Sequence, residues 1–177
     1  MTSQFEIDTE EFRTAFNRAA SVVPVKTTKE VLKYVKASSK GDGVLCLVGS
    51  DSEIAIAVQT PIVDRRSFEM LLPAAKVKSW ISLVTGSRVT IEHVDGKLDM
   101  WSGAATLKCG TDNAADFPAI ETFESTGEAN VPAEVLAAAS RKTAFAADET
   151  STRYALGGVY FERDGDTLIL VSTDTRR

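Results

Sequence analysis

The chain repeats one order of elements three times, and this repeat limits its possible folds more than any other feature. Each repeat is expected to hold a strand, an amphipathic helix and then up to three strands, with repeats starting near residues 4, 67 and 128. Apolar residues recur at helical spacing in the expected helices and at every second position in the expected strands. Because one repeat cannot bury both its helix face and its sheet face, we expect two repeats to pair into one domain.

The first two repeats contain every element of this pattern. The first holds a strand at 5–8, a helix over 10–23 with Thr9 as its N-cap, and strands at 31–37, 44–48 and 53–58. The second holds a strand at 67–72, a helix over 74–84 that Gly86 ends, and strands at 88–93, 97–101 and 105–109. Pro73 is placed at the first helical position, where its missing N–H would be unpaired in any case.

The third repeat follows the same order but lacks its last strand. It is expected to hold a strand at 128–131, Pro132 at the first helical position, a helix over 133–143, and strands at 156–162 and 167–171. Gly49-Ser50-Asp51 of the first repeat returns as Ser172-Thr173-Asp174. We therefore expect a first domain over 1–120, a polar linker over 121–127 and an incomplete second domain over 128–177, with an unpaired sheet edge and exposed apolar surface.

Composition places this α+β chain among folded globular domains. Of its 177 residues, 44% are hydrophobic and 25% are charged, which excludes wholesale disorder, collagen-like repeats and coiled coils. The N-terminus lacks a basic and apolar leader, and no apolar run approaches membrane-spanning length, so we expect a cytoplasmic protein that does not contact membranes. Cys46 and Cys109 lie far apart in apolar runs and are interpreted as reduced core thiols.

Few residues support catalysis. His93 is the only histidine, and the chain has neither a G-x-S-x-G nucleophile elbow nor a glycine-rich phosphate loop. The acidic residues Asp51, Glu53 and Asp64 flank turns, where hydrogen bonding to the backbone is more common than magnesium binding. We expect no metal and no cofactor. If the chain were a small unrelated enzyme, its catalytic candidates would be His93, Asp51 and Asp174.

The distribution of charge along the chain is more informative than its net charge. The net charge is −5, yet residues 24–40 hold five lysines (Lys26, Lys29, Lys33, Lys36 and Lys40) against Glu30 alone. This stretch is either a phosphate-facing patch or a solvated strand edge whose lysines deter aggregation. The three expected helices carry six basic and three acidic residues while the remainder is acidic. That division suits a protein that shows one face to a polyanion.

Several short motifs, weak singly, are specific in their order and spacing. They are Leu71-Leu72-Pro73-Ala74-Ala75-Lys76, Val89-Thr90-Ile91, Lys97-Leu98, Trp101-Ser102-Gly103, Asp116-Phe117-Pro118, Val131-Pro132-Ala133, Thr143-Ala144-Phe145, Arg153-Tyr154-x-Leu156-x-Gly158-Val159 and Val171-Ser172-Thr173-Asp174. Together they resemble the bacterial DNA polymerase III beta subunit, the sliding clamp, over its first domain and part of its second.

The resemblance implies a DNA-clamp fold of paired repeats, with helices on one face of antiparallel sheets. It also implies a non-catalytic ring of two head-to-tail chains, with three domains in each chain and helices lining a hole around duplex DNA. The implied partners are duplex DNA, the replicative polymerase, the clamp loader and other proteins with clamp-binding motifs, with a homo-oligomer in the full-length protein. The alternative is a clamp-derived adaptor or inhibitor that binds a protein without encircling DNA.

The resemblance also implies site residues. Lys26 takes the place of a DNA-contacting arginine and Lys76 keeps a basic residue on the second helix, whereas Ala75 stands where an arginine is frequent. Thr150 and Tyr154 fall in a DNA-approaching loop, whose frequent second aromatic is here Ala155. The groove for partner peptides would include Leu156, Thr173, Thr175, Arg176 and Arg177. Of these, Thr175 and Arg176 replace the usual glycine and histidine.

Overall fold

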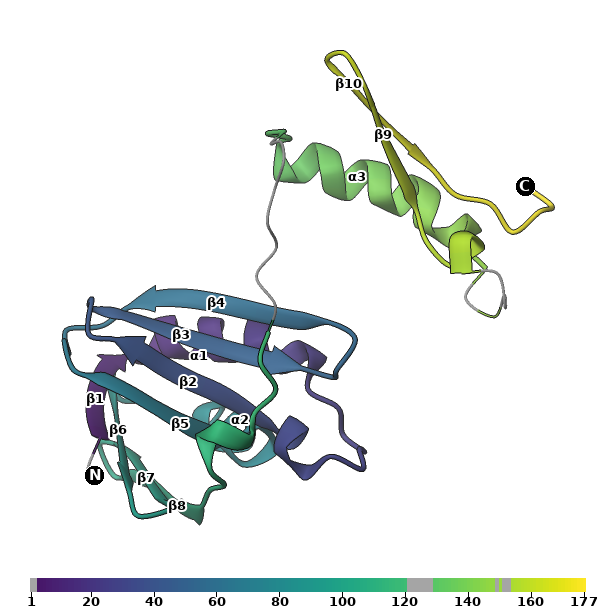
Figure 1. Ribbon diagram of the computed structural model, residues 1–177. Helices are drawn as coiled ribbons and strands as arrows, with labels where there is room; N and C mark the ends of the chain where they lie inside the picture. Colours follow the sequence, from purple (N-terminus) through teal and green to yellow (C-terminus); the bar gives the residue numbers. More distant parts are fainter. Residues whose placement is uncertain (1–2, 121–128, 149, 151–153) are drawn as a thin grey trace. The chain divides into compact units, whose positions relative to one another are not determined.

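The computed structural model describes residues 3–120, 129–148, 150 and 154–177. The chain divides into two compact units, an N-terminal unit (Met1–Glu121) and a C-terminal unit (Thr122–Arg177) (Figure 1). The linker expected over 121–127 lies outside the described residues.

The N-terminal unit contains two four-stranded antiparallel sheets (Figure 1). The first has the order β4-β3-β2-β5 and consists of β2 (Tyr34–Lys40), β3 (Val44–Ser50), β4 (Ala55–Pro61) and β5 (Ser67–Pro73). The second has the order β1-β6-β7-β8 and consists of β1 (Ser3–Asp8), β6 (Arg88–Val94), β7 (Lys97–Ser102) and β8 (Ala105–Gly110).

The two repeats of this unit exchange their opening strands. Strand β1 opens the first repeat but pairs with β6 of the second, with Ile7 opposite Val89. Strand β5 opens the second repeat but pairs with β2 of the first, with Leu72 opposite Val35. Each sheet is therefore completed by the other repeat, which confirms that two repeats make one folded unit.

Helix α1 (Thr9–Ala19) packs against β3 and β4 and also contacts α2 (Ala74–Ile81), which packs against β5. Helix α1 begins one residue earlier than expected, because Oδ1 of Asp8 accepts hydrogen bonds from the backbone N–H of Glu10 (2.8 Å) and Glu11 (3.1 Å). Thr9 is the first helical residue, and its hydroxyl donates to the carbonyl of Gly86 at 2.6 Å. The expected N-cap at Thr9 is thus corrected to Asp8.

The helix ends also differ from the sequence expectation. Pro73 and Pro132 are the N-cap residues of their helices, not the first helical residues. The helix expected to reach Val23 gives way after Ala19 to a 3-10 turn, and α2 stops at Ile81, well before Gly86. Short 3-10 turns cover Ala20–Val22, Glu30–Lys33 and Ala114–Asp116 in this unit.

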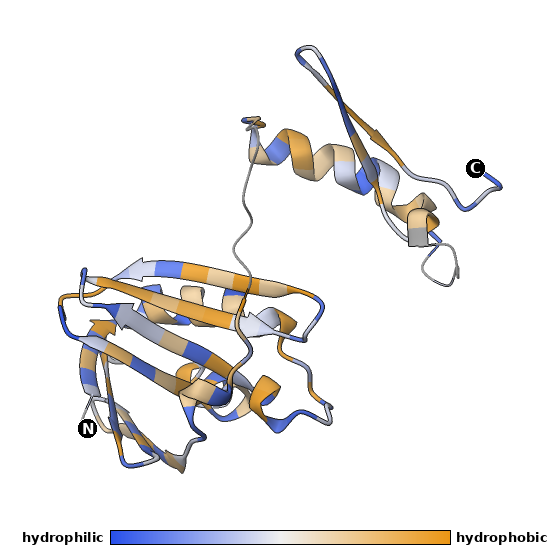
Figure 2. Cartoon of the chain, viewed as in Figure 1, coloured by the Kyte–Doolittle hydropathy of each residue, from blue (hydrophilic) through white to orange (hydrophobic). Residues whose placement is uncertain are grey.

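One hydrophobic core lies between the helices and the two sheets. Figure 2 shows the alternation of apolar and polar residues along the strands that produces it. Its largest fully buried members include Phe5, Phe12, Phe16, Leu45, Leu47, Met70, Leu72, Ile81, Ile91 and Leu98. Cys46 and Cys109 are free thiols as expected but only half-buried, so they lie outside the deepest core. Burial nevertheless raises the pKa of both thiols.

The C-terminal unit contains α3 (Ala133–Thr143), 3-10 turns at Ala144–Ala146 and Tyr154–Leu156, and a hairpin of β9 (Tyr160–Asp164) and β10 (Thr167–Val171). Helix α3 contacts β10. The strand expected at 156–162 starts only at Tyr160 because the preceding residues form a turn. Residues 129–131, expected to be a strand, are not one, and Glu128 lies outside the described residues.

Candidate nucleic-acid and partner-peptide sites

Lys26 and Lys76 lie on neighbouring segments of the N-terminal unit. Lys26 is exposed in the loop after α1, and Lys76 is exposed in the first turn of α2. A hollow of about 230 Å³ joins the two segments, since Val25 from the loop and Ala75 from the helix both line it. Lys78 of α2 lines the same hollow. Lys33 also lines this hollow, whereas Lys76 lines a second hollow with Trp80 and Leu83. The two predicted DNA-contacting lysines therefore lie on neighbouring segments but not around one hollow, and Ala75, at the departure from the family pattern, lines both hollows.

The lysine-rich stretch at residues 24–40 does not form one patch. Lys33 pairs with Glu30 at 2.8 Å, and Lys36 on β2 pairs with Glu69 of β5 at 3.1 Å. These two lysines therefore satisfy acidic neighbours on the protein itself. Within the described part of the chain, Lys26 and Lys29 form no ion pair. Both residues precede β2.

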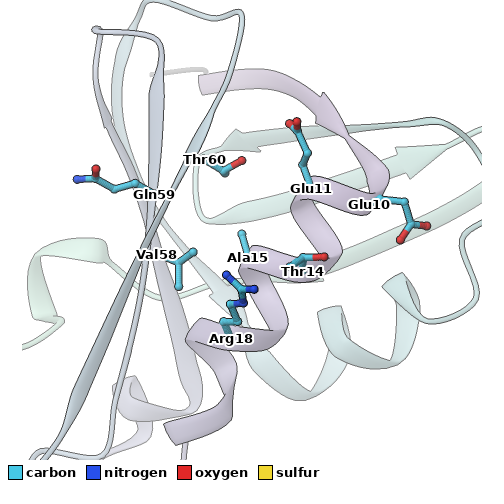
Figure 3. Close-up of a pocket in the computed structure, with 8 residues that line it drawn as sticks. All are labelled: Glu10, Glu11, Thr14, Ala15, Arg18, Val58, Gln59 and Thr60. Atoms are coloured by element: carbon cyan, nitrogen blue, oxygen red, sulfur yellow. The ribbon is translucent and has the colours of Figure 1, made fainter. Parts of the chain in front are cut away.

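The charged side chains of α1 differ in whether other groups of the protein already engage them. A groove of about 370 Å³ between α1 and β4 has Glu10 and Glu11 toward one end and Arg18 toward the other (Figure 3). Arg13 pairs with Glu10, and its guanidinium donates to the carbonyls of Ile81 (3.2 Å) and Val84 (2.8 Å). Arg13 thus joins α1 to the end of α2, a structural role that its place among the basic helix residues did not reveal.

Thr150 and Tyr154 lie on either side of residues 151–153, which are outside the described residues. Thr150 is exposed, and its N–H and hydroxyl both donate to Oδ1 of Asp148, at 3.1 and 2.9 Å. Tyr154 is the first residue of a 3-10 turn.

The predicted partner residues at 173–177 form a single hydrogen-bonded loop. The hydroxyl of Thr173 donates to the carbonyl of Arg177 at 2.6 Å and accepts from the N–H of Thr175 at 3.0 Å. Oδ1 of Asp174 accepts from the N–H of Arg176 (2.9 Å) and Arg177 (3.1 Å), and these backbone donors, with the Arg177 charge, lower the pKa of Asp174. The carboxylate therefore shapes the loop.

The same loop occurs in the first repeat. The hydroxyl of Ser50 donates to the carbonyl of Ile54 at 2.9 Å, and Oδ1 of Asp51 accepts from the N–H of Glu53 and of Ile54, each at 2.8 Å. These backbone donors lower the pKa of Asp51. The repeated Gly/Ser-Ser/Thr-Asp motif thus encodes a turn, so Asp51 and Asp174 have structural roles in place of the catalytic ones considered above.

Phe145 is a further residue of this region, and the sequence interpretation did not assign it to the site. Its side chain is 65% exposed, and the guanidinium of Arg177 lies 5.4 Å from its ring centroid. The carbonyl of Leu156 accepts from the N–H of Asp148 at 2.8 Å. Residues 145–148 therefore contact both Leu156 and Arg177, which brings the two ends of the predicted peptide groove to one segment. The sequence signal that could have identified Phe145 is its place as the aromatic residue of the motif Thr143-Ala144-Phe145.

Thr175 has a backbone φ of 72°, in the region that a β-branched residue rarely adopts. We expect Thr175→Gly to stabilise the C-terminal unit by about 1 kcal/mol, because glycine adopts this conformation without strain. Hydrogen exchange at the N–H groups of Arg176 and Arg177 measures the effect. Gly158→Ala is the control, since an added Cβ there meets nothing within 4 Å. Unchanged or faster exchange in Thr175→Gly would contradict this prediction.

Three further observations concern the described residues. They contain no group of three or more His, Cys, Asp or Glu side chains that could hold a metal ion. Among the described helices, none is both long and apolar enough to cross a membrane. His93 is half-buried on β6, and its Nε2 has no hydrogen-bond partner in the described structure.

Comparison with known families decides the relationship. Residues 3–121 match the N-terminal domain of the DNA polymerase III beta subunit, and residues 130–177 match its central domain. The chain belongs to the DNA polymerase III beta subunit family. Its similarity to the beta sliding clamp of Escherichia coli K12 is 28% identity over 138 residues, covering 77% of this chain and 38% of that protein.

Other beta sliding clamps match a longer part of the chain. The Pseudomonas aeruginosa clamp is 28% identical over 175 residues, covering 98% of this chain and 47% of that protein. A crystal structure of a Pseudomonas aeruginosa DnaN clamp bound to griselimycin superposes with a TM-score of 0.89 at 26% identity, covering 97% of this chain and 47% of that one. The beta subunit chain described here thus spans less than half the length of these relatives, and its fold is that of a sliding clamp.

Proposed function

We propose that this beta subunit chain acts as a sliding clamp, a non-catalytic processivity factor that encircles duplex DNA and tethers the replicative polymerase. Residues 1–120 would form the first clamp domain, and residues 128–177 would form part of the second. The proposed partners are duplex DNA, the polymerase, the clamp loader, other proteins with clamp-binding motifs and further clamp chains. Leu156 and the loop at 173–177 would contact partner peptides, alongside Phe145.

One observation carries the proposal for DNA binding. Lys26 in the loop after α1 and Lys76 and Lys78 on α2 are exposed and form no ion pair with described residues, whereas Lys33, Lys36 and Lys108 pair with acidic side chains. Available positive charge therefore gathers beside the helices of an acidic protein. Such charge attracts phosphates without reading bases, which is what a protein that slides along DNA requires.

The test is the salt dependence of duplex binding. We expect Lys26→Ala and Lys76→Ala each to weaken binding of a labelled duplex several-fold and to reduce the slope of log K against log [salt] by about 0.9. Fluorescence anisotropy at several salt concentrations measures both quantities. Lys97→Ala is the matched control, because Lys97 is exposed at the start of β7, outside α1 and α2.

Two results would count against this proposal. Equal losses in Lys97→Ala and Lys26→Ala would show that only total charge matters. Salt-independent binding, or none, together with capture of a clamp-binding peptide, would support the adaptor alternative, since apolar contacts depend little on salt.

A further inference from the structure

The hollow of about 230 Å³ in the N-terminal unit lies between the 3-10 turn after α1, the loop at 23–25 and α2. Its most buried lining residues are Ala20 and Ala74, which are 8% and 6% exposed. Because alanine has no side-chain atoms beyond Cβ, these two helical segments leave a space between them. Val23 and Pro24 of the loop extend the apolar lining. The sequence thus produces a small apolar hollow at this place.

The charged residues that line this hollow are both basic. They are Lys33 and Lys78, and no acidic residue in the described part of the chain joins them in the lining. Lys78 is exposed and forms no ion pair with described residues, while Lys33 pairs with Glu30. Lys26 adds an exposed charge directly after Val25 of the lining. An occupant of the hollow therefore gains from negative charge at its rim.

The start of α2 adds to the positive potential at the hollow. Its N-cap Pro73 supplies no side-chain hydrogen bond, and its first turn holds no acidic residue. Helix α1 differs, because it has Asp8 as its N-cap and two acidic residues in its first turn. Ala74 and Ala75 of the first turn of α2 both line the hollow. Since a helix N-terminus carries partial positive charge, this turn strengthens the attraction that the lysines exert on an anionic occupant.

The lining favours an aliphatic side chain over a nucleobase. No residue of the described chain that lines the hollow is aromatic, whereas unpaired bases are bound largely by stacking on aromatic rings. The hollow is also smaller than the sites of roughly 300–1,000 Å³ that hold small-molecule ligands. An aliphatic side chain needs only apolar surroundings, which the valine, proline and alanine residues supply. A peptide that carries such a side chain between carboxylates matches both the lining and the rim.

We propose that this hollow is a docking site for an acidic segment of a partner protein. The segment inserts one aliphatic side chain the size of leucine and places its carboxylates beside Lys78 and Lys26. The site lies in the N-terminal unit and uses none of the residues of the partner-peptide groove proposed above. Because Lys78 belongs to the exposed charge proposed to attract DNA, the segment and a duplex exclude each other; this exclusion rests on the proposed function, whereas peptide binding does not.

NMR titration of the isotope-labelled full chain tests the site with three capped pentapeptides. Asp-Asp-Leu-Asp-Asp carries both features, Asp-Asp-Ser-Asp-Asp lacks the aliphatic side chain, and Ser-Ser-Leu-Ser-Ser lacks the charge. We expect the first peptide to shift the amide signals of Val23, Val25 and Ala75 and to bind about tenfold more tightly than either of the others. Added salt should weaken both acidic peptides and preserve the ratio of their affinities, because salt screens charge and leaves apolar burial in place.

Two variants locate the site, and each has a matched control. Val25→Asp places a carboxylate in the lining and Lys78→Glu reverses the unpaired charge, so each is expected to weaken binding of Asp-Asp-Leu-Asp-Asp about fivefold. Val63→Asp and Lys97→Glu are the controls and should bind as the wild-type chain does. Val25 and Val63 are 92% and 80% exposed, and Lys97 is exposed at the start of β7. Circular dichroism verifies that all four variants stay folded.

Three results would overturn the docking site. They are equal affinities for the leucine and serine peptides, no amide shifts at millimolar peptide, and losses in the control variants as large as those in Val25→Asp and Lys78→Glu. Shifts of the same amides with protein concentration alone would also overturn it, because a second copy of the chain would then fill the hollow.

A competing duplex separates this proposal from the DNA-binding one. Displacement of the bound peptide by duplex DNA would support the shared use of Lys78. Peptide binding that a duplex leaves unchanged would support the docking site and contradict DNA contact at Lys78, so the two proposals fail independently.

Discussion

Replacing Gly49 with alanine is expected to destabilise the N-terminal unit by about 3 kcal/mol, one of the two largest effects anticipated for this chain. Gly49 is buried on β3 beneath the end of α1. An added Cβ would lie 2.0 Å from the carbonyl oxygen of Ala19 and 2.9 Å from its carbonyl carbon. Because both atoms are backbone, α1 has to move away from the sheet. Urea unfolding followed by circular dichroism measures the loss.

Gly110→Ala is the matched control for this substitution. Gly110 ends β8, and the nearest heavy atom to its added Cβ would be the carbonyl oxygen of Gly96 at 3.9 Å. The free energy of unfolding of Gly110→Ala should differ from that of the wild-type chain by no more than about 0.5 kcal/mol. If Gly49→Ala destabilised the N-terminal unit no more than Gly110→Ala does, α1 would not pack against β3 as closely as the structure shows.

Gly49→Ala also tests how the fold supports the proposed DNA binding. The loop that holds Lys26 follows α1 and its 3-10 turn, so displacement of the helix end moves this lysine relative to Lys76. We therefore expect weaker duplex binding in this variant even at temperatures where it stays folded.

Local patterns predicted most of the architecture. The recurring order of strand, helix and strands is visible in the sequence because the periods of helices and strands differ, and the structure confirms it for the first two repeats. The exchange of β1 and β5 between repeats was not predictable in the same way. Phe5 and Ile7 show that β1 has a buried face, but alternation does not say which sheet supplies the partner strand.

The errors at element boundaries have related causes. Residues 129–131 were predicted as a strand from their place in the repeat, but Ala129 and Asn130 have low strand propensity, and no strand of the described residues pairs with them. Asp8 replaced Thr9 as N-cap because Thr9 instead donates to Gly86, 77 positions away in the chain. A contact at that distance leaves no local signal.

The candidate DNA site was predicted in part. The exposure of Lys26 and Lys76 follows from their positions after one helix and on another. The sequence did not reveal that Lys36 pairs with Glu69 across β2 and β5, or that Arg13 joins two helices. Such pairings depend on strand register and helix packing, so the count of basic residues overstated the charge available to DNA.

The second large effect concerns the contact between the two opening strands. Phe5 of β1 and Phe68 of β5 are 2% and 5% exposed, and their rings stack with centroids 4.9 Å apart and an interplanar angle of 7°. The two residues come from different sheets and different repeats, so this contact lies where the exchange of strands closes the core. Phe5→Ala is expected to destabilise the N-terminal unit by about 3–5 kcal/mol through lost burial and a residual cavity.

A double-mutant cycle isolates the stacking itself. Phe68→Ala should cost a similar amount, and Phe5→Ala, Phe68→Ala together should cost less than the sum of the two by about 0.5–1.5 kcal/mol, because each single change already removes the ring contact. Leu83→Ala is the control, since Leu83 is 78% exposed and its loss should stay within about 0.5 kcal/mol. Strict additivity would mean that the rings of Phe5 and Phe68 do not interact across the sheets.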